Sequence, residues 1–179
     1  MAVSHVLVIS GSPSATSKTE AIGDHVARRL ADYEWHAGHL KVRTLPAAPL
    51  LNADTTHPAI AQALEQVSRA DGIVLATPTY KASFSGLLKT FLDLLPRYGF
   101  RHKAVLPLAT GGSVAHLLIL DYALRPVAHA LGARHVVQSF FLLDEHIRWQ
   151  EGRPHLLPES TRLLDDVIEQ FRKSLISAS

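Results

Sequence analysis

The chain has 179 residues, of which 18 are Lys or Arg, 16 are Asp or Glu, 11 are His and none is Cys. This length suits one hydrophobic core, so we expect a single domain over residues 1–179. The absence of Cys excludes disulfides, thiol catalysis and thiolate metal ligands. The formal charge of +2 comes without a Lys or Arg cluster, which does not indicate a nucleic-acid-binding surface. Because no transmembrane segment or signal peptide is recognisable, we expect a cytoplasmic protein without membrane contact.

Apolar runs and helical patterns alternate along the chain. Runs rich in β-branched residues predict five buried strands, at residues 3–9, 39–45, 72–76, 104–109 and 135–142. Apolar residues at helical spacing predict five helices, at residues 17–30, 58–70, 83–95, 114–131 and 159–176. Residues 46–52 are expected to form a loop, and residues 144–158 a polar excursion.

This alternation predicts an α/β fold in which helices cover both faces of a parallel sheet. Right-handed crossovers favour a doubly wound arrangement, and the five-stranded version with order 2-1-3-4-5 is a flavodoxin-like three-layer sandwich. Ligands of such folds bind beyond the carboxyl ends of the strands, where the strand order reverses. Three turns rich in Gly, Pro and hydroxyl residues are expected to meet there, at residues 11–18, 77–85 and 110–116.

The first turn, residues 11–19, carries five hydroxyl residues and one Lys at the start of a helix. Ser17 and Glu20 have the spacing of a capping box, in which the hydroxyl and the carboxylate bond to unpaired amides. A helix N-terminus suits a phosphate, and Lys18 would help to neutralise it. A Walker A loop is excluded because Ser12 and Ser17 stand where it needs Gly, and a dinucleotide fingerprint needs more glycines. The alternative is a capped helix behind an ordinary polar loop.

The second and third turns offer groups suited to a flat ring. In residues 77–81, Pro78 and Tyr80 would present backbone groups and an aromatic wall at the end of a strand. Gly111 and Gly112 let the backbone approach a ligand closely. The alternatives are an aromatic ring packed on the next helix and a plain tight turn.

Other chemistries find less support. Residues 111–115 resemble a hydrolase nucleophile elbow with Ser113 as nucleophile, and Asp144 and His155 follow downstream. Only one predicted strand remains after the elbow to carry these two residues. His116 lies near the third turn, whereas the other histidines are interpreted as surface or interface residues. Because no His pair has ligand spacing, no metal site is expected.

The predicted helix at residues 114–131 has two unusual features. Apolar residues surround most of it, which predicts a subunit interface. Pro126 cannot donate a hydrogen bond to the carbonyl of Tyr122, so the helical ladder should open within residues 121–125 as a kink, a break or a π-bulge. The alternative is that Pro126 starts a second helical piece.

Three segments of the sequence resemble the NAD(P)H-dependent FMN reductases. They are residues 11–14 with Ser17 and Thr19, residues 78–96, and residues 108–118. The likeness is greatest to the reductase component of two-component alkanesulfonate monooxygenase systems. It implies a flavodoxin-like fold that binds FMN. The implied phosphate contacts are Ser12, Ser14, Ser17, Lys18 and Thr19. The implied ring contacts are Pro78, Thr79, Tyr80, Lys81, Thr110, Gly111, Gly112 and Ser113. Ser85 in the second turn and His116 near the third are also expected to bind the cofactor.

The resemblance also implies a reaction and partners. Hydride would pass from NADPH or NADH to the flavin without a protein acid or base, and reduced FMN would leave for a partner monooxygenase of organosulfur metabolism. Tyr122 matches an inserted residue that forms a π-helix at a tetramer interface, so a homo-oligomer through residues 114–131 is expected, with Tyr122 as a modulator of flavin release. A flavodoxin-like electron carrier, a quinone or azo reductase, and a serine hydrolase using Ser113 remain the alternatives.

Overall fold

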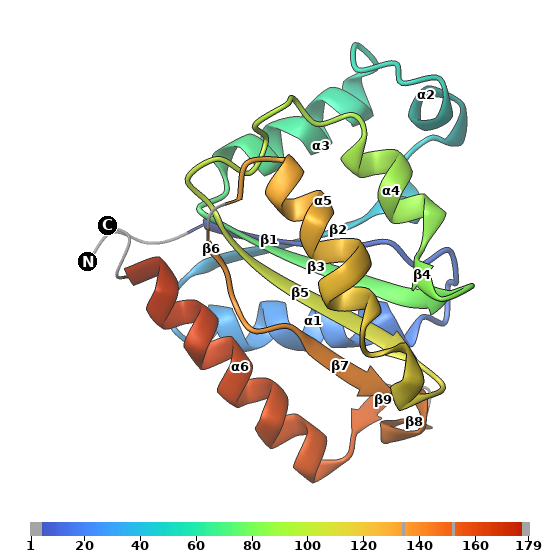
Figure 1. Cartoon of the computed structure of the whole chain (residues 1–179), viewed down its shortest axis with the longest axis vertical. Coiled ribbons are helices and arrows are strands. Elements are labelled where there is room, and N and C mark those ends of the chain that lie inside the picture. The colour runs from blue at the N-terminus through green and yellow to red at the C-terminus, as the bar shows by residue number, and fades with distance from the viewer. Residues whose placement is uncertain (1–4, 134, 152, 177–179) are drawn as a thin grey trace.

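The computed structural model describes residues 5–133, 135–151 and 153–176, and a mostly parallel sheet lies between two layers of helices (Figure 1). The strands are β1 (His5–Ser10), β2 (His36–Lys41), β3 (Gly72–Tyr80), β4 (Ser83–Phe84), β5 (Ala104–Gly111), β6 (His135–Val136), β7 (Phe140–Leu143), β8 (Ile147–Gln150) and β9 (Arg153–Leu156). The α-helices are α1 (Lys18–Ala31), α2 (Ala47–Leu51), α3 (Pro58–Arg69), α4 (Gly86–Leu92), α5 (Arg125–Ala130) and α6 (Pro158–Ile176). The remaining helical turns are η1 (Val42–Thr44), η2 (Val114–His116), the π-helix η3 (Leu120–Leu124) and η4 (Asp144–His146).

The strand order β2-β1-β3-β5-β6 confirms the predicted doubly wound, flavodoxin-like fold. The sheet has seven strands rather than five, because β4 pairs antiparallel with β3 and the fifth position is shared by β6 and β7. The predicted strand at residues 135–142 is therefore interrupted. At the interruption, the Arg125 guanidinium donates to the carbonyls of Val136 and Val137 and to the hydroxyl oxygen of Ser139. These bonds hold the bend between β6 and β7.

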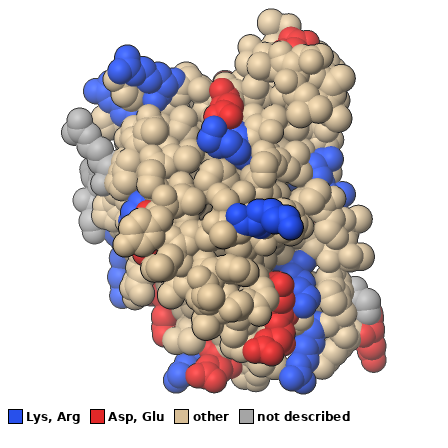
Figure 2. Space-filling model, turned by 45° about the vertical axis from the view of Figure 1, so that its right-hand side comes forward, with Lys and Arg blue, Asp and Glu red and all other residues tan. Residues whose placement is uncertain are grey.

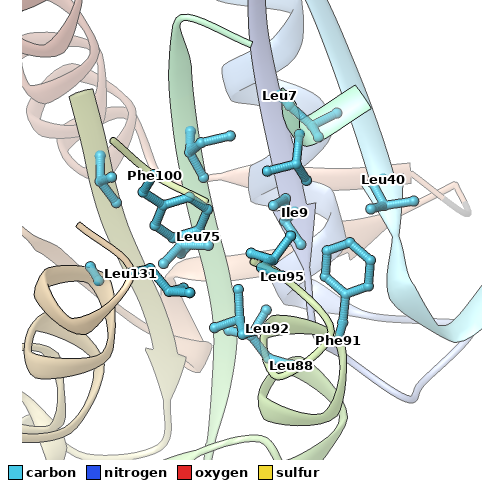
Figure 3. Packing of buried hydrophobic residues seen from close by; sticks show 14 of the residues in the cluster. Leu7, Ile9, Leu40, Leu75, Leu88, Phe91, Leu92, Leu95, Phe100 and Leu131 are labelled. Atoms are coloured by element: carbon cyan, nitrogen blue, oxygen red, sulfur yellow. The ribbon is translucent and has the colours of Figure 1, made fainter. Parts of the chain in front are cut away.

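Alternate residues of the central strands face two separate cores, as the two-residue period of a strand requires. On β1, Val6 and Val8 pack with apolar residues of α1 and α6, whereas Leu7 and Ile9 pack with those of α3 and α4. Figure 3 shows the second core, in which the apolar side chains of α4 point toward β1 and β3. Because both faces are covered, the carboxyl edge of the sheet is left for a ligand.

The second strand begins and ends earlier than the predicted 39–45. Residues 36–38 lack an apolar run because β2 is an edge strand with alternating exposed positions. The strand ends where the Thr44 hydroxyl donates to the carbonyl of Lys41 at 2.8 Å and closes the turn η1. The loop predicted at residues 46–52 contains the short helix α2.

The β3–β4 hairpin replaces parts of a predicted turn and a predicted helix. β3 does not stop at residue 76 but continues through residues 77–80, and its last two residues pair with β4. The helix predicted at residues 83–95 therefore begins only at Gly86. In the same way, β5 continues past its predicted end at residue 109 to Gly111, since β3 and β7 both pair with its final residues.

The helix predicted at residues 114–131 is divided into η2, η3 and α5. The π-helix η3 covers the place where Pro126 was expected to open the ladder, and Pro126 lies in the first turn of α5. Tyr122 lies at the centre of η3. The sequence left two alternatives, a distorted helix and a second helical piece that starts at Pro126, and the structure contains both. Pro is tolerated at the start of α5 because the first N–H groups of a helix have no partner within it.

The start of α1 shows half of the predicted capping box. The Ser17 hydroxyl accepts a hydrogen bond from the Glu20 amide at 3.0 Å. The Glu20 carboxylate instead accepts from the Arg43 guanidinium, at 2.7 and 3.1 Å. Glu20 therefore links α1 to η1, and its predicted reciprocal bond at the helix start is replaced.

The polar excursion at residues 144–158 contains η4 and the β8–β9 hairpin, and α6 then begins at Pro158. Leu164, Ile168 and Phe171 bury one side of α6 against the sheet. No helix in the described part of the chain has the length and apolar character needed to cross a membrane.

Candidate functional site

The three predicted turns meet at the carboxyl edge of the sheet. The Gly11 amide donates to the carbonyl of Ala76 at 2.9 Å, and the Ser85 hydroxyl donates to the Gly11 carbonyl. The hydroxyls of Thr19 and Thr110 share a hydrogen bond of 2.8 Å. Each contact joins segments that are distant in sequence, so the turns after β1, β3 and β5 form one connected surface.

The first turn is organised by its own hydroxyl groups. The Ser12 hydroxyl accepts from the Ser14 amide at 3.3 Å, and the Ser14 hydroxyl accepts from the Thr16 amide at 3.2 Å. Ser12 and Ser17 are buried, Ser14 is half-buried and Thr16 is exposed. The turn leads into the N-terminus of the 14-residue helix α1, where unpaired amides and the helix dipole favour an anion. This arrangement suits a phosphate.

Lys18 and Thr19 bind other parts of the protein. The Lys18 ammonium donates to the carbonyl of Asp144 at 2.6 Å, which ties the first turn to η4. The Thr19 hydroxyl is buried against Thr110. In this structure both side chains join the loops around the site, whereas the sequence predicts that they contact a phosphate.

The second turn is the tip of the β3–β4 hairpin, which the sequence analysis missed. Lys81 and Ala82 have φ angles of 49° and 57°, the left-handed conformation that a two-residue hairpin turn requires. Asn-Gly is the usual sequence for this turn, so Lys-Ala carries no recognisable signal. The hairpin presents Tyr80 with 47% of its surface exposed. The ring is therefore available to a ligand at this edge.

Thr77 and Ser85 brace the base of this hairpin. The Thr77 hydroxyl donates to the carbonyl of Pro78 and accepts from the Ser85 amide, both at 2.9 Å. The Ser85 hydroxyl also accepts from the Leu88 amide at 3.1 Å and so caps α4. Both side chains are buried. Ser85 therefore acts on the shape of the site through Gly11 and α4.

Two polar atoms at the second and third turns are buried without a hydrogen-bond partner. They are the Thr79 hydroxyl oxygen and the His116 Nδ1. A Cβ atom on Gly111 would lie 3.2 Å from the Thr79 oxygen and 2.9 Å from the ring of Phe141, whereas one on Gly112 would meet nothing within 4 Å. A buried polar atom without a partner costs about 1–3 kcal/mol. The unpartnered Thr79 oxygen lies beside the Gly111 backbone, and the open backbone of Gly112 follows directly, a combination that suits the polar edge of a bound ring.

The third turn does not form a hydrolase site. The Ser113 hydroxyl accepts from the Ala115 amide at 3.2 Å and caps η2. The carbonyl of Asp144 accepts from Lys18, and His155 lies in β9, paired with Arg148. Ser113 is thus a helix cap in this structure, and the geometry does not support the triad alternative. Among the described residues, no group of three His, Asp or Glu side chains is arranged to hold a metal ion.

Next to the third turn, the segment from η2 through the following turn to η3 exposes large apolar side chains. The exposed fractions are 68% for Val114, 49% for Leu117, 58% for Leu118 and 78% for Tyr122. We call these four residues the apolar face. Figure 2 shows the molecule with its right-hand side turned forward, where wide areas carry no charged side chain and several Asp, Glu, Lys and Arg residues gather at the lower edge.

Comparison with known proteins shows the family to which a chain with this fold and these turns belongs. The profile of the family described as NADPH-dependent FMN reductase matches residues 4–147. The chain belongs to this family. It is therefore an oxidoreductase that reduces FMN with NADPH or NADH, which confirms the predicted family, enzyme class and cofactors.

Individual relatives support the same assignment. An FMN reductase (NADPH) of Pseudomonas putida is 42% identical over 95% of this chain and 87% of its own length. An FMN reductase (NADPH) of Escherichia coli is 39% identical over 95% of this chain and 89% of its own length. The crystal structure of an NADH:FMN oxidoreductase, EMOB, in its apo form superposes with a TM-score of 0.86 at 42% identity, covering 96% of this chain and 90% of the other.

Proposed function

We propose that FMN binds across the three turns at the carboxyl edge of the sheet. The phosphate would lie at the N-terminus of α1 against Ser12, Ser14 and Ser17. The ring would lie between the hairpin of β3 and β4 and the turn after β5, with contacts from Pro78, Thr79, Tyr80, Lys81, Gly111, Gly112, Ser113 and His116. The main support is that the Thr79 hydroxyl oxygen in the second turn and the His116 Nδ1 in the third are buried without a hydrogen-bond partner.

In this proposal, Lys18, Thr19, Ser85 and Thr110 act mainly by holding the turns together. Their hydrogen bonds to Asp144, to each other and to Gly11 join all three turns. A preformed site loses less entropy when a ligand binds. The phosphate is then held by the hydroxyls of the first turn and the amides of α1 rather than by a lysine side chain.

When bound, FMN would supply the chemistry of the reaction as the acceptor of a hydride from the nicotinamide. Hydride transfer to the flavin needs no protein acid or base, so His116, Lys81 and Tyr80 are assigned binding roles only. Backbone N–H groups at Gly111 and Gly112 would stabilise negative charge at the pyrimidine edge of the ring. The exposed ring of Tyr80 would limit the movement of a planar ligand, and the buried Pro78 would stiffen the strand behind it. The contribution of the protein would then be orientation and electrostatics.

Replacement of Thr79 by Val tests this placement. The change keeps the shape of the side chain and removes an unpartnered oxygen, so the free energy of unfolding should stay constant or rise. If the oxygen binds FMN, the dissociation constant for FMN should rise about tenfold. Thr77→Val is the matched control, because its hydroxyl already has two partners and its loss should lower stability. Unchanged FMN affinity in a folded Thr79→Val variant would contradict the proposed ring site.

The phosphate placement needs a separate measurement. Titration of the protein with FMN, riboflavin and FAD, followed by quenching of flavin fluorescence, should show FMN binding more tightly than riboflavin. Equal affinity for FMN and riboflavin would show that the first turn does not bind the phosphate.

We further propose that the reduced flavin is delivered to a separate monooxygenase of organosulfur metabolism. The resemblance of residues 78–96 and 108–118 to the reductases of alkanesulfonate systems supports this role. In a coupled assay with such a monooxygenase, the protein with NADPH or NADH and FMN should sustain oxygenation of the sulfonate. Steady NAD(P)H consumption without any oxygenation would argue for another electron acceptor.

The apolar face supports a homo-oligomer. Four large apolar side chains within nine residues are exposed along η2, η3 and the turn between them, and an exposed patch of this kind often marks an interface. We propose that a second copy of the chain covers them. Because the face adjoins Gly112 and Ser113, the oligomer would also limit access to the ring site.

A further inference from the structure

A series of side-chain hydrogen bonds, buried at its Ser10 end and half-exposed at Asp24, lies behind the first turn and joins β1, β2 and α1. The Ser10 hydroxyl lies 2.5 Å from Nε2 of His39, and Nδ1 of His39 lies 2.7 Å from a carboxylate oxygen of Asp24. Ser10 is the last residue of β1, His39 lies within β2, and Asp24 lies in the second turn of α1. The sequence analysis interprets His39 as a surface or interface residue, which is wrong because its side chain is 92% buried (8% exposed).

The order Ser, His, Asp resembles that of a hydrolase triad, but the site cannot work as one. Ser10 is completely buried, so no acyl substrate can reach its oxygen. Gly23 covers the imidazole so closely that a Cβ atom there would lie 2.6 Å from the ring carbon and 3.0 Å from the Ser10 oxygen. The ring therefore fills the space between α1 and the strands, and its role is structural or positional.

Burial, more than the neighbouring charges, determines the direction in which the pKa of His39 shifts. Burial lowers the pKa of His39, although the hydrogen bond and the charge of Asp24 oppose this effect. Lys41 on the same strand lowers the pKa further and Glu20 on α1 raises it, while Arg43 on η1 pairs with Glu20. In the neutral ring, Nδ1–H donates to Asp24 and Nε2 accepts the proton of the Ser10 hydroxyl.

The series of hydrogen bonds ends at Ser10, the residue directly before the first turn. Ser10 directly precedes Gly11, whose amide and carbonyl are bonded to Ala76 and Ser85. Ser12, the first hydroxyl of the turn, follows. Asp24 belongs to the helix whose N-terminus faces the same turn. His39 thus connects the end of β1 to α1, the two elements that the phosphate would touch.

We propose that His39 is a positioning residue for the phosphate of FMN: its bonds to Ser10 and Asp24 fix the end of β1 against α1 so that the turn between them keeps its shape. The inference rests on the proposed phosphate site. It implies that loss of one of these hydrogen bonds weakens the binding of FMN. The binding of riboflavin should stay almost unchanged, because riboflavin has no phosphate to contact the first turn.

The test compares dissociation constants for FMN and riboflavin in Ser10→Ala, His39→Gln and Asp24→Asn. In Ser10→Ala and His39→Gln, the FMN constant should rise about tenfold, the value of one buried hydrogen bond, while the riboflavin constant changes less than about twofold. Asp24→Asn keeps a hydrogen-bond acceptor at a half-exposed position, and should raise the FMN constant by about two- to threefold. His36→Gln, an exposed position of the same strand, is the matched control and should leave both constants unchanged.

The outcomes separate this inference from the site on which it rests. Suppose that the wild type binds FMN more tightly than riboflavin. If the variants then keep the same preference, or lose affinity for both flavins equally, the positioning role alone is overturned. A wild-type protein that does not distinguish FMN from riboflavin overturns the phosphate site and the inference with it. If Ser10→Ala does not fold, Asp24→Asn decides, because a folded Asp24→Asn protein with an unchanged FMN-to-riboflavin ratio also overturns the role.

Discussion

The hydroxyls of Thr19 and Thr110 are hydrogen-bonded at 2.8 Å although 91 positions separate them in the chain. Thr19 lies in the first turn of α1, and Thr110 is the second-last residue of β5. Both are buried. This bond therefore sets the distance between the proposed phosphate and pyrimidine ends of the site.

Thr19→Val should destabilise the protein, because it leaves the buried Thr110 hydroxyl without its partner at a cost of about 1–3 kcal/mol. Urea denaturation would measure the loss. The double variant Thr19→Val with Thr110→Val should be more stable than the sum of the two single losses predicts. Thr55→Val, in an exposed turn, is the control and should change little. Additive effects of the two changes would show that the bond contributes nothing.

Gly11→Ala tests the close packing of the first turn on α4. A Cβ atom at residue 11 would lie 2.3 Å from the Cβ of Leu88 and 3.0 Å from its Cα, which a side-chain rotation cannot relieve. We expect a loss of about 3 kcal/mol in the free energy of unfolding, together with weaker FMN binding. Gly86→Ala is the matched control, because a Cβ there meets nothing within 4 Å at the start of the same helix. Equal stability of the two variants would contradict this packing.

The sequence predicts the architecture well because the information is local and periodic. Alternating apolar runs locate the central strands, and Pro126 locates the π-helix to within a few residues. The β3–β4 hairpin is missed because its turn uses Lys81 and Ala82 where glycine or asparagine is expected. β2 is misplaced because an edge strand lacks a continuous apolar run.

The sequence also predicts only part of the candidate site. That the three turns meet follows from strand order, and the structure confirms it. The individual partners do not follow, because they depend on tertiary contacts. Lys18 bonds to a carbonyl in η4, 126 positions away along the chain. His39 is covered by Gly23, and a single small residue in a helix gives no sequence signal for such a contact.

Leu118→Glu should dissociate the proposed oligomer. A charged side chain at the centre of the apolar face would have to be buried without a partner in an interface. Light scattering after size-exclusion chromatography would show a lower mass than that of the wild type. Leu163→Glu is the control, since Leu163 is also exposed, at 44%, but lies on α6. A wild-type protein that is monomeric at high concentration would rule out the interface.

Tyr122→Ala addresses the same face from its π-helix. The side chain is 78% exposed, so its loss should hardly change the stability of the isolated chain. If the face is an interface beside the ring site, the change should alter the oligomeric mass or the amount of FMN retained after gel filtration. Values equal to those of the wild type in both measurements would remove Tyr122 from the proposed role.

Stability should fall as the pH decreases below the ordinary pKa of histidine, and His39 should account for part of this fall. Burial lowers the pKa of His39 below 6.5 in the folded protein, so the unfolded chain takes up a proton first as the solution is acidified. The stabilisation is present above pH 6.5 and is lost between 6.5 and the lower folded value. Urea midpoints measured from pH 8 to pH 5 should therefore decline less steeply in His39→Gln than in the wild type or in His36→Gln. The pKa of Asp24 is also lowered, because the hydrogen bonds from His39 and Lys41 outweigh the opposing effect of burial, but this group acts only below pH 3.8 and lies outside the measured range. An equal slope in all three proteins would mean that His39 is not buried in its neutral form.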